Sequence, residues 1–265
     1  MAITTLDQYI AAPSQRVGII KTGSIVSVAL MNTQVLQAAG NPGAGVLAGT
    51  STAAGVVPTD ADTGFPAINA FGSGATGYIS NITFGSTVAA RITLFDCLFK
   101  AGAYAFNAAT TLASQPSYST RVIGGADFTN TEIWIEAVTA FTGNQSVAIT
   151  YTNQSGTTAR TTGTIATGVA PIIGRMLQLP LQAGDTGVQK IESVTSTVST
   201  VGTFNVLVLR RLWSGRVIVA NGGDTHDFLK TGMPIIFADS ALMAIPQPDS
   251  TTTGTFELVC EVING

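Results

Sequence analysis

The stretch TEIWIEAVTAFTGNQSVAITYTNQSGTTARTTG, residues 131–163, indicates the fold class of the chain. Apolar and polar side chains alternate along it, so that Ile133, Ile135 and Ala137 lie on one face of an extended strand. A period of two is typical of a β-strand with one buried face, whereas a helix repeats every 3.6 residues. We therefore predict a strand at the start of the stretch, with these three side chains in a core.

Two turns divide this stretch into three runs. Gly143-Asn144 and Ser155-Gly156 are residue types that adopt the backbone conformations of tight hairpin turns. The three runs therefore predict a three-stranded antiparallel meander. The second face of the first run carries Glu132, Trp134 and Glu136, a mixed set that we expect to be buried against a second sheet or a second chain.

The same period of two recurs through the chain after residue 77. Some ten short strands, with turn residues between them and no helical pattern, favour an antiparallel β-sandwich or barrel in a mainly β protein. The first two further runs, separated by Gly85-Ser86, are predicted to pair with each other. The further runs are YISNITF (78–84), RITLFDCLF (91–99), IIGRMLQLPL (172–181), GVQKIESVTST (187–197), GTFNVLVLRRL (202–212), RVIVA (216–220) and GTFELVCEVI (254–263).

The N-terminal region follows a different pattern. Val28, Met31 and Val35 recur at helical spacing, and Gly and Pro in residues 40–43 follow them as a stop signal. This pattern predicts a short helix over 25–39.

Residues 43–77 are rich in Gly, Ala, Pro and Thr and have no period. Long segments of this kind in compact proteins tend to be functional arms or linkers. We predict an extended Gly/Ala-rich arm that reaches across a neighbouring subunit. The expected division is therefore residues 1–77, with helix and arm, and residues 78–265, with β-structure that can divide again near 165–175.

The composition points to a neutral surface. Hydrophobic residues make up 45% of the chain but charged residues only 10%, against roughly 25% in an average soluble domain. Thr, Ser, Asn, Gln, Gly and Ala fill the intervening positions, and the strongly hydrated Lys is depleted at protein interfaces in general. Two explanations account for this pattern. The chain is built to pack against copies of itself or against another assembly, or the low charge reflects composition bias alone.

Charge and hydropathy argue against two classes of partner, nucleic acids and membranes. The net charge is −3 and the basic residues are scattered, so there is no basic stripe for phosphates and no direct nucleic-acid partner is expected. No run approaches the roughly 18 consecutive apolar residues of a membrane helix, so no membrane partner is expected either.

Two motifs suggest chemistry but lack its context. Gly72–Gly77, GSGATG, matches the dinucleotide pattern, yet a predicted strand follows it where a phosphate-binding helix is needed. His226, the only histidine, stands between Asp224 and Asp227, which would suit a metal or an acid–base site. Polar clusters after Gly-Gly are more often turn residues with local hydrogen bonds, and we expect that role here.

The cysteines and carboxylates give no better candidate. Cys97 and Cys260 lie on alternating apolar strands and are predicted to be core thiols without an activating base. Glu132 and Glu136 share a strand face in the manner of a glycosidase pair, but their neighbours give no reason for a pKa shift. We predict that both are solvated or interfacial, and that the chain has no catalytic, cofactor-binding or metal-binding residue.

Four segments of this chain, taken in order, resemble virion structural proteins of tailed bacteriophages, of the kind encoded near head genes. The resemblance spans most of the chain. It lies in composition and turn patterns and contains no reactive residue, so it carries no site residues over to this sequence. The segments are AAGNPGAGVLAGTSTAAGVVPTDADTG (38–64), RITLFDCLF (91–99), TEIWIEAVTAFTGNQSVAITYTNQSGTTART (131–161) and LPLQAGDTGVQKIESVTSTVSTVGTFNVLVLRRL (179–212).

The resemblance implies a non-enzymatic head decoration or cement protein, made in the host cytoplasm and resident in the virion. Its implied partners are the major capsid protein and further copies of itself, with a trimer favoured. The alternative is a tail, spike or vertex component that binds a receptor or glycan through exposed Trp134 or Trp213. A β-structured glycan depolymerase is not expected, because no carboxylate pair or histidine dyad supports it.

Overall fold

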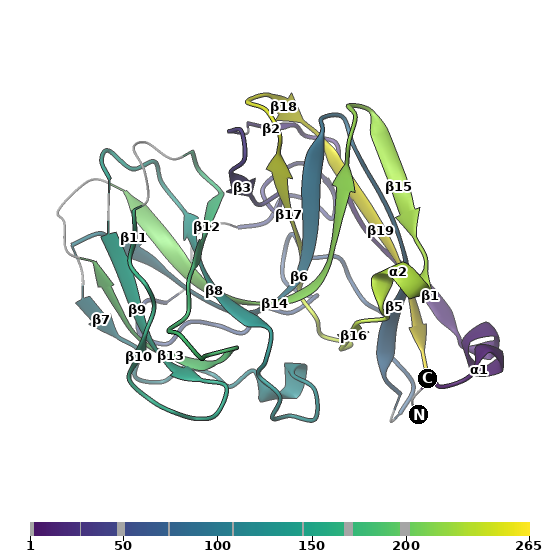
Figure 1. The fold of residues 1–265 in the computed structure, drawn as a ribbon, viewed down its shortest axis with the longest axis horizontal. Coiled ribbons are helices and arrows are strands. Elements are labelled where there is room, and N and C mark those ends of the chain that lie inside the picture. The colour runs from purple at the N-terminus through teal and green to yellow at the C-terminus, as the bar shows by residue number, and fades with distance from the viewer. Residues whose placement is uncertain are drawn as a thin grey trace.

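The structure is a computed structural model, mainly β, with two lobes that share two long strands (Figure 1). These strands, β6 (Ala90–Ala105) and β14 (Thr203–Val217), pair antiparallel along most of their length. The predicted fold class is confirmed. The residues that the structure describes are 3–26, 28–46, 51–73, 75–107, 109–144, 146–166, 172–196 and 202–265.

One lobe carries a sheet that joins the two ends of the chain, which we call the terminal sheet. Its strands are β1 (Ser14–Lys21), β4 (Gly40–Asn41), β5 (Gly77–Ser86), β15 (Gly222–His226), β16 (Ile235–Ile236) and β19 (Phe256–Asn264). The order is β15-β5-β19-β1-β4, with β16 also on β5. The N-terminal strand β1 thus lies between the C-terminal strand and β4.

Two further sheets complete the lobes. The central sheet has the order β17-β6-β14-β8-β12-β3, and the outer sheet has the order β10-β9-β13-β7 with β11 on β9. The added strands of the central sheet are β3 (Asn32–Thr33), β8 (Thr131–Ala137), β12 (Arg175–Leu179) and β17 (Leu242–Pro248). Those of the outer sheet are β7 (Ala109–Thr111), β9 (Ser146–Asn153), β10 (Arg160–Thr161), β11 (Ile165–Ala166) and β13 (Val188–Ser196). The short strands β2 (Ile25–Val26) and β18 (Thr253–Gly254) pair with each other.

Three clusters of buried apolar side chains fill the space between the layers. The first combines side chains of the outer and central sheets, the second those of the terminal and central sheets, and the third lies among strands of the central sheet and nearby loops. β6 and β14 contribute to all three. Examples are Phe99, Ile149 and Val206 in the first, Ile82, Leu94 and Leu258 in the second, and Phe95, Leu209 and Met243 in the third.

The alternation along β8 is borne out on both faces. Ile133, Ile135 and Ala137 are buried in the first cluster, as predicted. Trp134, on the opposite face, is buried in the third cluster, where its ring meets Phe95 edge-on with 5.6 Å between centroids. The mixed face of this strand is therefore buried within the chain itself.

The predicted strand pairs are partly wrong. β5 and β6 follow each other in sequence but lie in the terminal and central sheets, and β8 and β9 likewise belong to different sheets. Only the second half of the predicted meander, β9 with β10, pairs as expected. RVIVA is not a separate strand, because β14 ends at Val217 and the next two residues are exposed. Alternation fixes which face of a strand is buried but leaves its partner open.

The helix predicted over 25–39 is wrong in position. The described part of that range holds β2 and β3, whose backbones pair with β18 and β12, so long-range pairing outweighs a weak helical spacing. The short N-terminal helix is α1 (Leu6–Ala11). Its start is a capping box, in which Thr5 Oγ1 accepts from the Gln8 N–H and Gln8 Oε1 accepts from the Thr5 N–H, both at 3.2 Å.

Residues 51–56 of the predicted arm pair with their own chain. Val56 and Lys100 exchange backbone hydrogen bonds of 2.8 and 3.0 Å, and the Gly102 N–H donates to the Ser51 carbonyl at 3.0 Å. This part of the arm continues the central sheet beside the half of β6 that extends beyond its pairing with β17. It therefore covers a sheet edge that would otherwise be open.

The rest of the arm is also anchored within the chain. Phe65 and Ile68 are buried in the third and second clusters. Phe65 and Ile68 thus pack within their own chain, and the predicted contact of the arm with a neighbouring subunit stays a prediction. Residues 47–50 and Gly74 of the glycine motif lie outside the described part. The division at 77/78 and near 165–175 stays a prediction.

A buried ionic cluster lies where the arm, β6 and β14 meet. Asp96 of β6 is fully buried and forms ion pairs with Arg121 and Arg210. Asp96 Oδ2 accepts from Arg210 Nη2 at 3.1 Å and from the Ser240 hydroxyl at 2.9 Å, and Oδ1 accepts from the Ala241 N–H at 3.0 Å. The carboxylate is therefore satisfied on both oxygens.

Arg121 extends this cluster to the arm. It belongs to a 3-10 turn, η1 (Ser119–Arg121), and its side chain is the largest that is fully buried in the described chain. Its guanidinium donates to Asp96, to the Pro58 carbonyl of the arm and, at 3.0 Å, to the Cys97 carbonyl. One side chain thus connects the arm, β6 and the loop before β8.

We predict that Asp96→Asn lowers the free energy of unfolding by about 3–5 kcal/mol, because it leaves two buried guanidinium groups without a countercharge. Urea unfolding measures the effect. The control is Asp249→Asn, which breaks the exposed 3.0 Å pair with Arg216 and should cost less than about 1 kcal/mol. Equal losses in both variants would show that the Asp96 cluster does not stabilise the fold.

Candidate functional site

His226 ends β15 and is held by aromatic and acidic neighbours. Its Nδ1 accepts a hydrogen bond from Trp213 Nε1 at 3.0 Å, its ring packs edge-on against Phe84, and its Nε2 lies 3.5 Å from Asp224 Oδ2. Asp227 has a separate role, because its carboxylate caps the short helix α2 (Phe228–Thr231). The residues around His226 that were predicted to form a turn are therefore the end of strand β15 and the N-cap of helix α2. No group of three or more His, Cys, Asp or Glu side chains in the described residues is placed to hold a metal ion.

The cysteines are core thiols, as predicted. Cys97 and Cys260 are both fully buried. Burial raises the pKa of Cys97 to about 12 and raises the pKa of Cys260 as well. Because only the thiolate is a nucleophile, neither side chain is reactive at neutral pH.

Glu136 corrects the prediction of a solvated or interfacial carboxylate. It is fully buried, it accepts a hydrogen bond from Asn205 Nδ2 at 2.8 Å, and it lies 3.6 Å from Lys100 Nζ. Burial raises the pKa of Glu136, and the charge of Lys100 opposes that shift. Lys100 also donates to the Val46 carbonyl at 3.1 Å, so this pair forms a second connection between β6, β8 and the arm.

Glu132, on the same strand, is held near the surface. Its carboxylate accepts from Arg211 Nε at 2.9 Å and from Trp134 Nε1 at 2.8 Å. Trp134 and Trp213 are both buried, so neither offers the exposed ring that a sugar platform requires. The expectation of glycan binding through these two side chains is therefore wrong.

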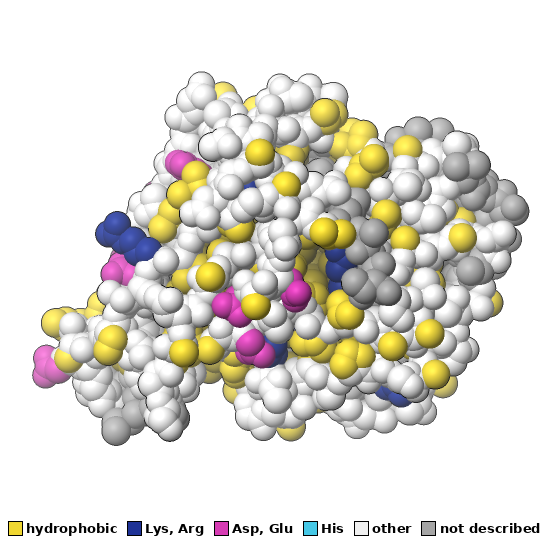
Figure 2. Space-filling model, turned by 180° about the vertical axis from the view of Figure 1, so that it is seen from behind, with side chains coloured by type: hydrophobic (Ala, Val, Ile, Leu, Met, Phe, Trp, Pro, Cys, Tyr) yellow, Lys and Arg dark blue, Asp and Glu magenta, His cyan; other side chains and the backbone are white. Residues whose placement is uncertain are grey.

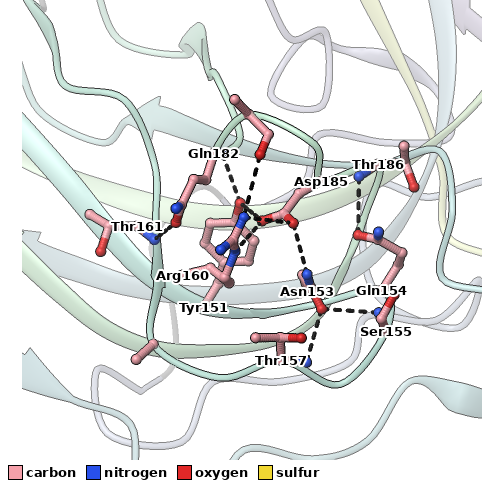
Figure 3. Close-up of polar contacts among 12 residues, drawn as sticks. Tyr151, Asn153, Gln154, Ser155, Thr157, Arg160, Thr161, Gln182, Asp185 and Thr186 are labelled. Carbon is pink, nitrogen blue, oxygen red and sulfur yellow. Dashed lines mark hydrogen bonds and ion pairs between the residues drawn. The ribbon is translucent and has the colours of Figure 1, made fainter.

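A polar cluster at one end of the outer sheet is centred on Asp185 (Figure 3). Asp185 accepts from the Tyr151 hydroxyl and from Asn153 Nδ2, each at 2.7 Å, and from two nitrogens of Arg160 at 2.9 and 3.2 Å. Hydrogen bonds from Arg160 hold the pKa of Asp185 down at about 2, and burial raises the pKa of Tyr151 to about 12. At neutral pH the carboxylate is therefore charged and the hydroxyl is a donor.

The same cluster fixes two loops. Asn153 Oδ1 accepts two backbone N–H groups of the turn that follows it, and Gln154 Oε1 accepts those of Thr186 and Gly187. The loop over residues 181–187 is thereby tied to the end of β9 (Figure 3). Sequence reasoning missed this cluster, because Asp185 stands in a turn with no periodic pattern around it. The only local signal is that Tyr151 and Asn153 occupy alternate positions on one strand.

Large apolar side chains are exposed on the two short helices near the chain ends. Leu6 and Ile10 of α1 are 63% and 72% exposed, and Leu229 of α2 is 78% exposed. The rings of Tyr9 and Phe228 pack at 5.1 Å between centroids and join the helices, beside an apolar hollow of about 390 Å³. We call these five residues the α1–α2 surface. No residue of α1 is buried, so this helix presents its apolar side chains to solvent.

The surface is also sparsely charged elsewhere. Figure 2 shows one face on which uncharged polar groups predominate, with single apolar side chains among them and few charged ones. Within the described ranges, none of the helices has the length and apolar character needed to cross a membrane. The α1–α2 surface is thus an exposed apolar area on a molecule with little surface charge.

The comparisons with known proteins are sparse. No protein-family model and no curated protein matches the chain. Among solved structures, it is similar to the structure of infectious bursal disease virus, Gt strain, with 8% identity over 96% of this chain and 81% of that chain and a TM-score of 0.20. For the crystal structure of the infectious bursal disease virus VP2 subviral particle, the identity is 8% over 96% and 80% of the two chains, with a TM-score of 0.17. TM-scores this low carry no argument about fold or function.

We predict a pH-dependent effect for Asp185→Asn. The folded pKa of Asp185, about 2, is below the ordinary value of about 3.9, so the carboxylate stabilises the fold above pH 4 and loses that contribution as the pH falls towards 2. The difference in unfolding free energy between wild type and variant should be about 2 kcal/mol at neutral pH and about half of that at pH 3. Urea titrations across this range test it, with Asp249→Asn as control, and a difference independent of pH would contradict it.

Proposed function

We propose that this protein is a non-enzymatic structural component of a virus particle, of the head decoration or cement type found in tailed bacteriophages. It binds the major capsid protein and further copies of itself, with a trimer favoured, and it resides in the virion after synthesis in the host cytoplasm. The observation that carries the proposal is the α1–α2 surface, an exposed apolar contact area on a molecule with few surface charges.

Physical chemistry supports a docking role for this surface. Full burial of an exposed Leu or Ile side chain contributes roughly 1.5–3 kcal/mol, so Leu6, Ile10 and Leu229 together are a substantial source of binding free energy. The same two helices also carry the exposed Asp7, Asp227 and Lys230, which can pair with opposite charges of a partner at the rim of a contact. The surface therefore suits a permanent contact in an assembly.

The state of the reactive side chains supports the non-enzymatic part of the proposal. Both thiols are buried, Glu136 is paired with Lys100, and Asp185 accepts hydrogen bonds on both oxygens. These groups hold loops and strands together. The resemblance of the four sequence segments to phage virion proteins supplies the particle type and the preference for a trimer.

We predict that Leu6→Ser combined with Ile10→Ser reduces the affinity for particles stripped of this protein by at least about tenfold, because it removes two anchors of the contact. Sedimentation of the protein with particles measures the effect. The unfolding free energy should change by less than about 0.5 kcal/mol, since neither side chain is buried. The control is Leu30→Ser, an exposed apolar residue outside this surface, and an equal loss in the control would contradict the assignment.

The copy number in purified particles tests the broader proposal. Quantitative mass spectrometry against the major capsid protein should give a fixed simple ratio for a shell-wide decoration protein. A few copies per particle would assign the chain to a vertex or the tail. Its absence from the particle would refute the virion role.

A further inference from the structure

A polar hollow of about 440 Å³ lies between the start of β8 and the loop that joins β12 to β13. Residues 130–132 form one side and residues 178–186 the other. The Asn130 N–H donates to the Thr186 carbonyl at 2.9 Å, which ties the two sides together. Asp185, which belongs to the lining, is bonded to Tyr151 and Arg160 (Figure 3), so the loop side of the hollow is held in place.

Of the two carboxylates that line the hollow, that of Glu132 has a fixed orientation. Glu132 accepts from Trp134 Nε1 and from two nitrogens of Arg211, at distances of 2.8 to 3.3 Å. These bonds hold the carboxylate in place. Its side chain is 17% exposed, so it borders solvent and retains capacity to accept a further hydrogen bond.

Three exposed side-chain amides surround this carboxylate. Asn130 and Gln178 make no side-chain hydrogen bond to any described residue. Gln182 uses its oxygen to accept from the Thr161 N–H at 3.2 Å, and its amide nitrogen makes no hydrogen bond to the described residues. Leu181, which is partly buried, adds apolar surface to the lining, whereas Leu179 is buried in the first core cluster. The hollow therefore combines unused donors and acceptors with a small apolar area.

This combination matches an uncharged, polyhydroxylated ring. Each sugar hydroxyl can donate a hydrogen bond to a carboxylate or amide oxygen and accept one from an amide nitrogen. The C–H groups of the ring can pack against an apolar surface. The lining holds two carboxylates, those of Glu132 and Asp185, and no Lys or Arg, which disfavours an anionic ligand. We propose that this hollow binds a neutral sugar residue. The proposal goes beyond the structural role in the particle and does not depend on it.

The expected affinity is low for one site. The lining holds no exposed aromatic ring, so hydrogen bonds to a few amides must supply the binding free energy, and a dissociation constant on the order of 1 mM follows. Many copies on one particle would raise the avidity for a glycan-coated surface by about 10² or more, and this step alone rests on the proposed function. Strong binding to a glycan-coated surface would thus require many copies of the hollow to bind at once.

The test is saturation-transfer NMR on the purified protein with methyl glucoside, methyl galactoside, methyl mannoside or N-acetylglucosamine at about 10 mM. At least one of these sugars should receive saturation, while N-acetylneuraminic acid, which is anionic, should not. The variant Asn130→Gly combined with Gln178→Ala should weaken binding by about fivefold or more. Glycine is chosen at position 130 because the backbone there has φ of 60°, which glycine adopts without strain.

The matched control is Gln37→Ala combined with Asn107→Ala, which removes two exposed amides elsewhere. Thermal unfolding followed by circular dichroism verifies that both double variants fold. Absence of saturation transfer to every neutral sugar would overturn the proposal. So would equal weakening in the control, or binding of N-acetylneuraminic acid as strong as that of the neutral sugars. None of these results bears on the copy number in particles, so the two proposals fail separately.

Discussion

The fold depends on one buried carboxylate. Asp96 lies midway along β6, where that strand passes from one lobe to the other, and it is fully buried between Arg121 and Arg210. Charges taken out of water cost several kcal/mol each, so such a cluster persists only if every member keeps its partners in place. Because those partners come from the arm-binding turn, from β14 and from the segment before β17, one interaction sets the position of three parts of the chain.

The cluster lies on β6 between Phe95 and Cys97, two side chains of the third core. β6 and β14 give side chains to all three cores, and their pairing contains register shifts, one of them between Val208 and Leu209. Register shifts of this kind re-aim side chains and interrupt a continuous apolar layer. Arg121 and Lys100 occupy this region and bond to arm carbonyls, so the arm is held by polar contacts in addition to its buried Phe65 and Ile68. The arm is thus part of the lobe junction.

Local pattern predicted what is local. Alternation placed Ile133 and Trp134 on opposite buried faces, and the apolar neighbours of Cys97 predicted a core thiol. β5 pairs with β19, which lies more than a hundred residues later in the chain. Buried Glu136 is bonded to Asn205, 69 residues away, and buried Asp96 to Arg210, 114 residues away. No local period encodes contacts of this range. Asp96 has the appearance of an ordinary polar position in RITLFDCLF. Its role follows only from the approach of two arginines that the chain supplies elsewhere.

The interior charges also explain the neutral surface. Six of the 12 Lys and Arg side chains are in ion pairs with carboxylates, and Asp96, Glu136 and Asp185 in these pairs are almost or fully buried. Many of the few charged side chains therefore connect strands and loops. Hydroxyl, amide and apolar groups make up most of the remaining surface. Contacts between such surfaces are governed by burial and hydrogen bonding, and these are screened little by salt compared with exposed charge pairs. A protein with this distribution of charge is suited to an assembly that must hold across changes of ionic strength.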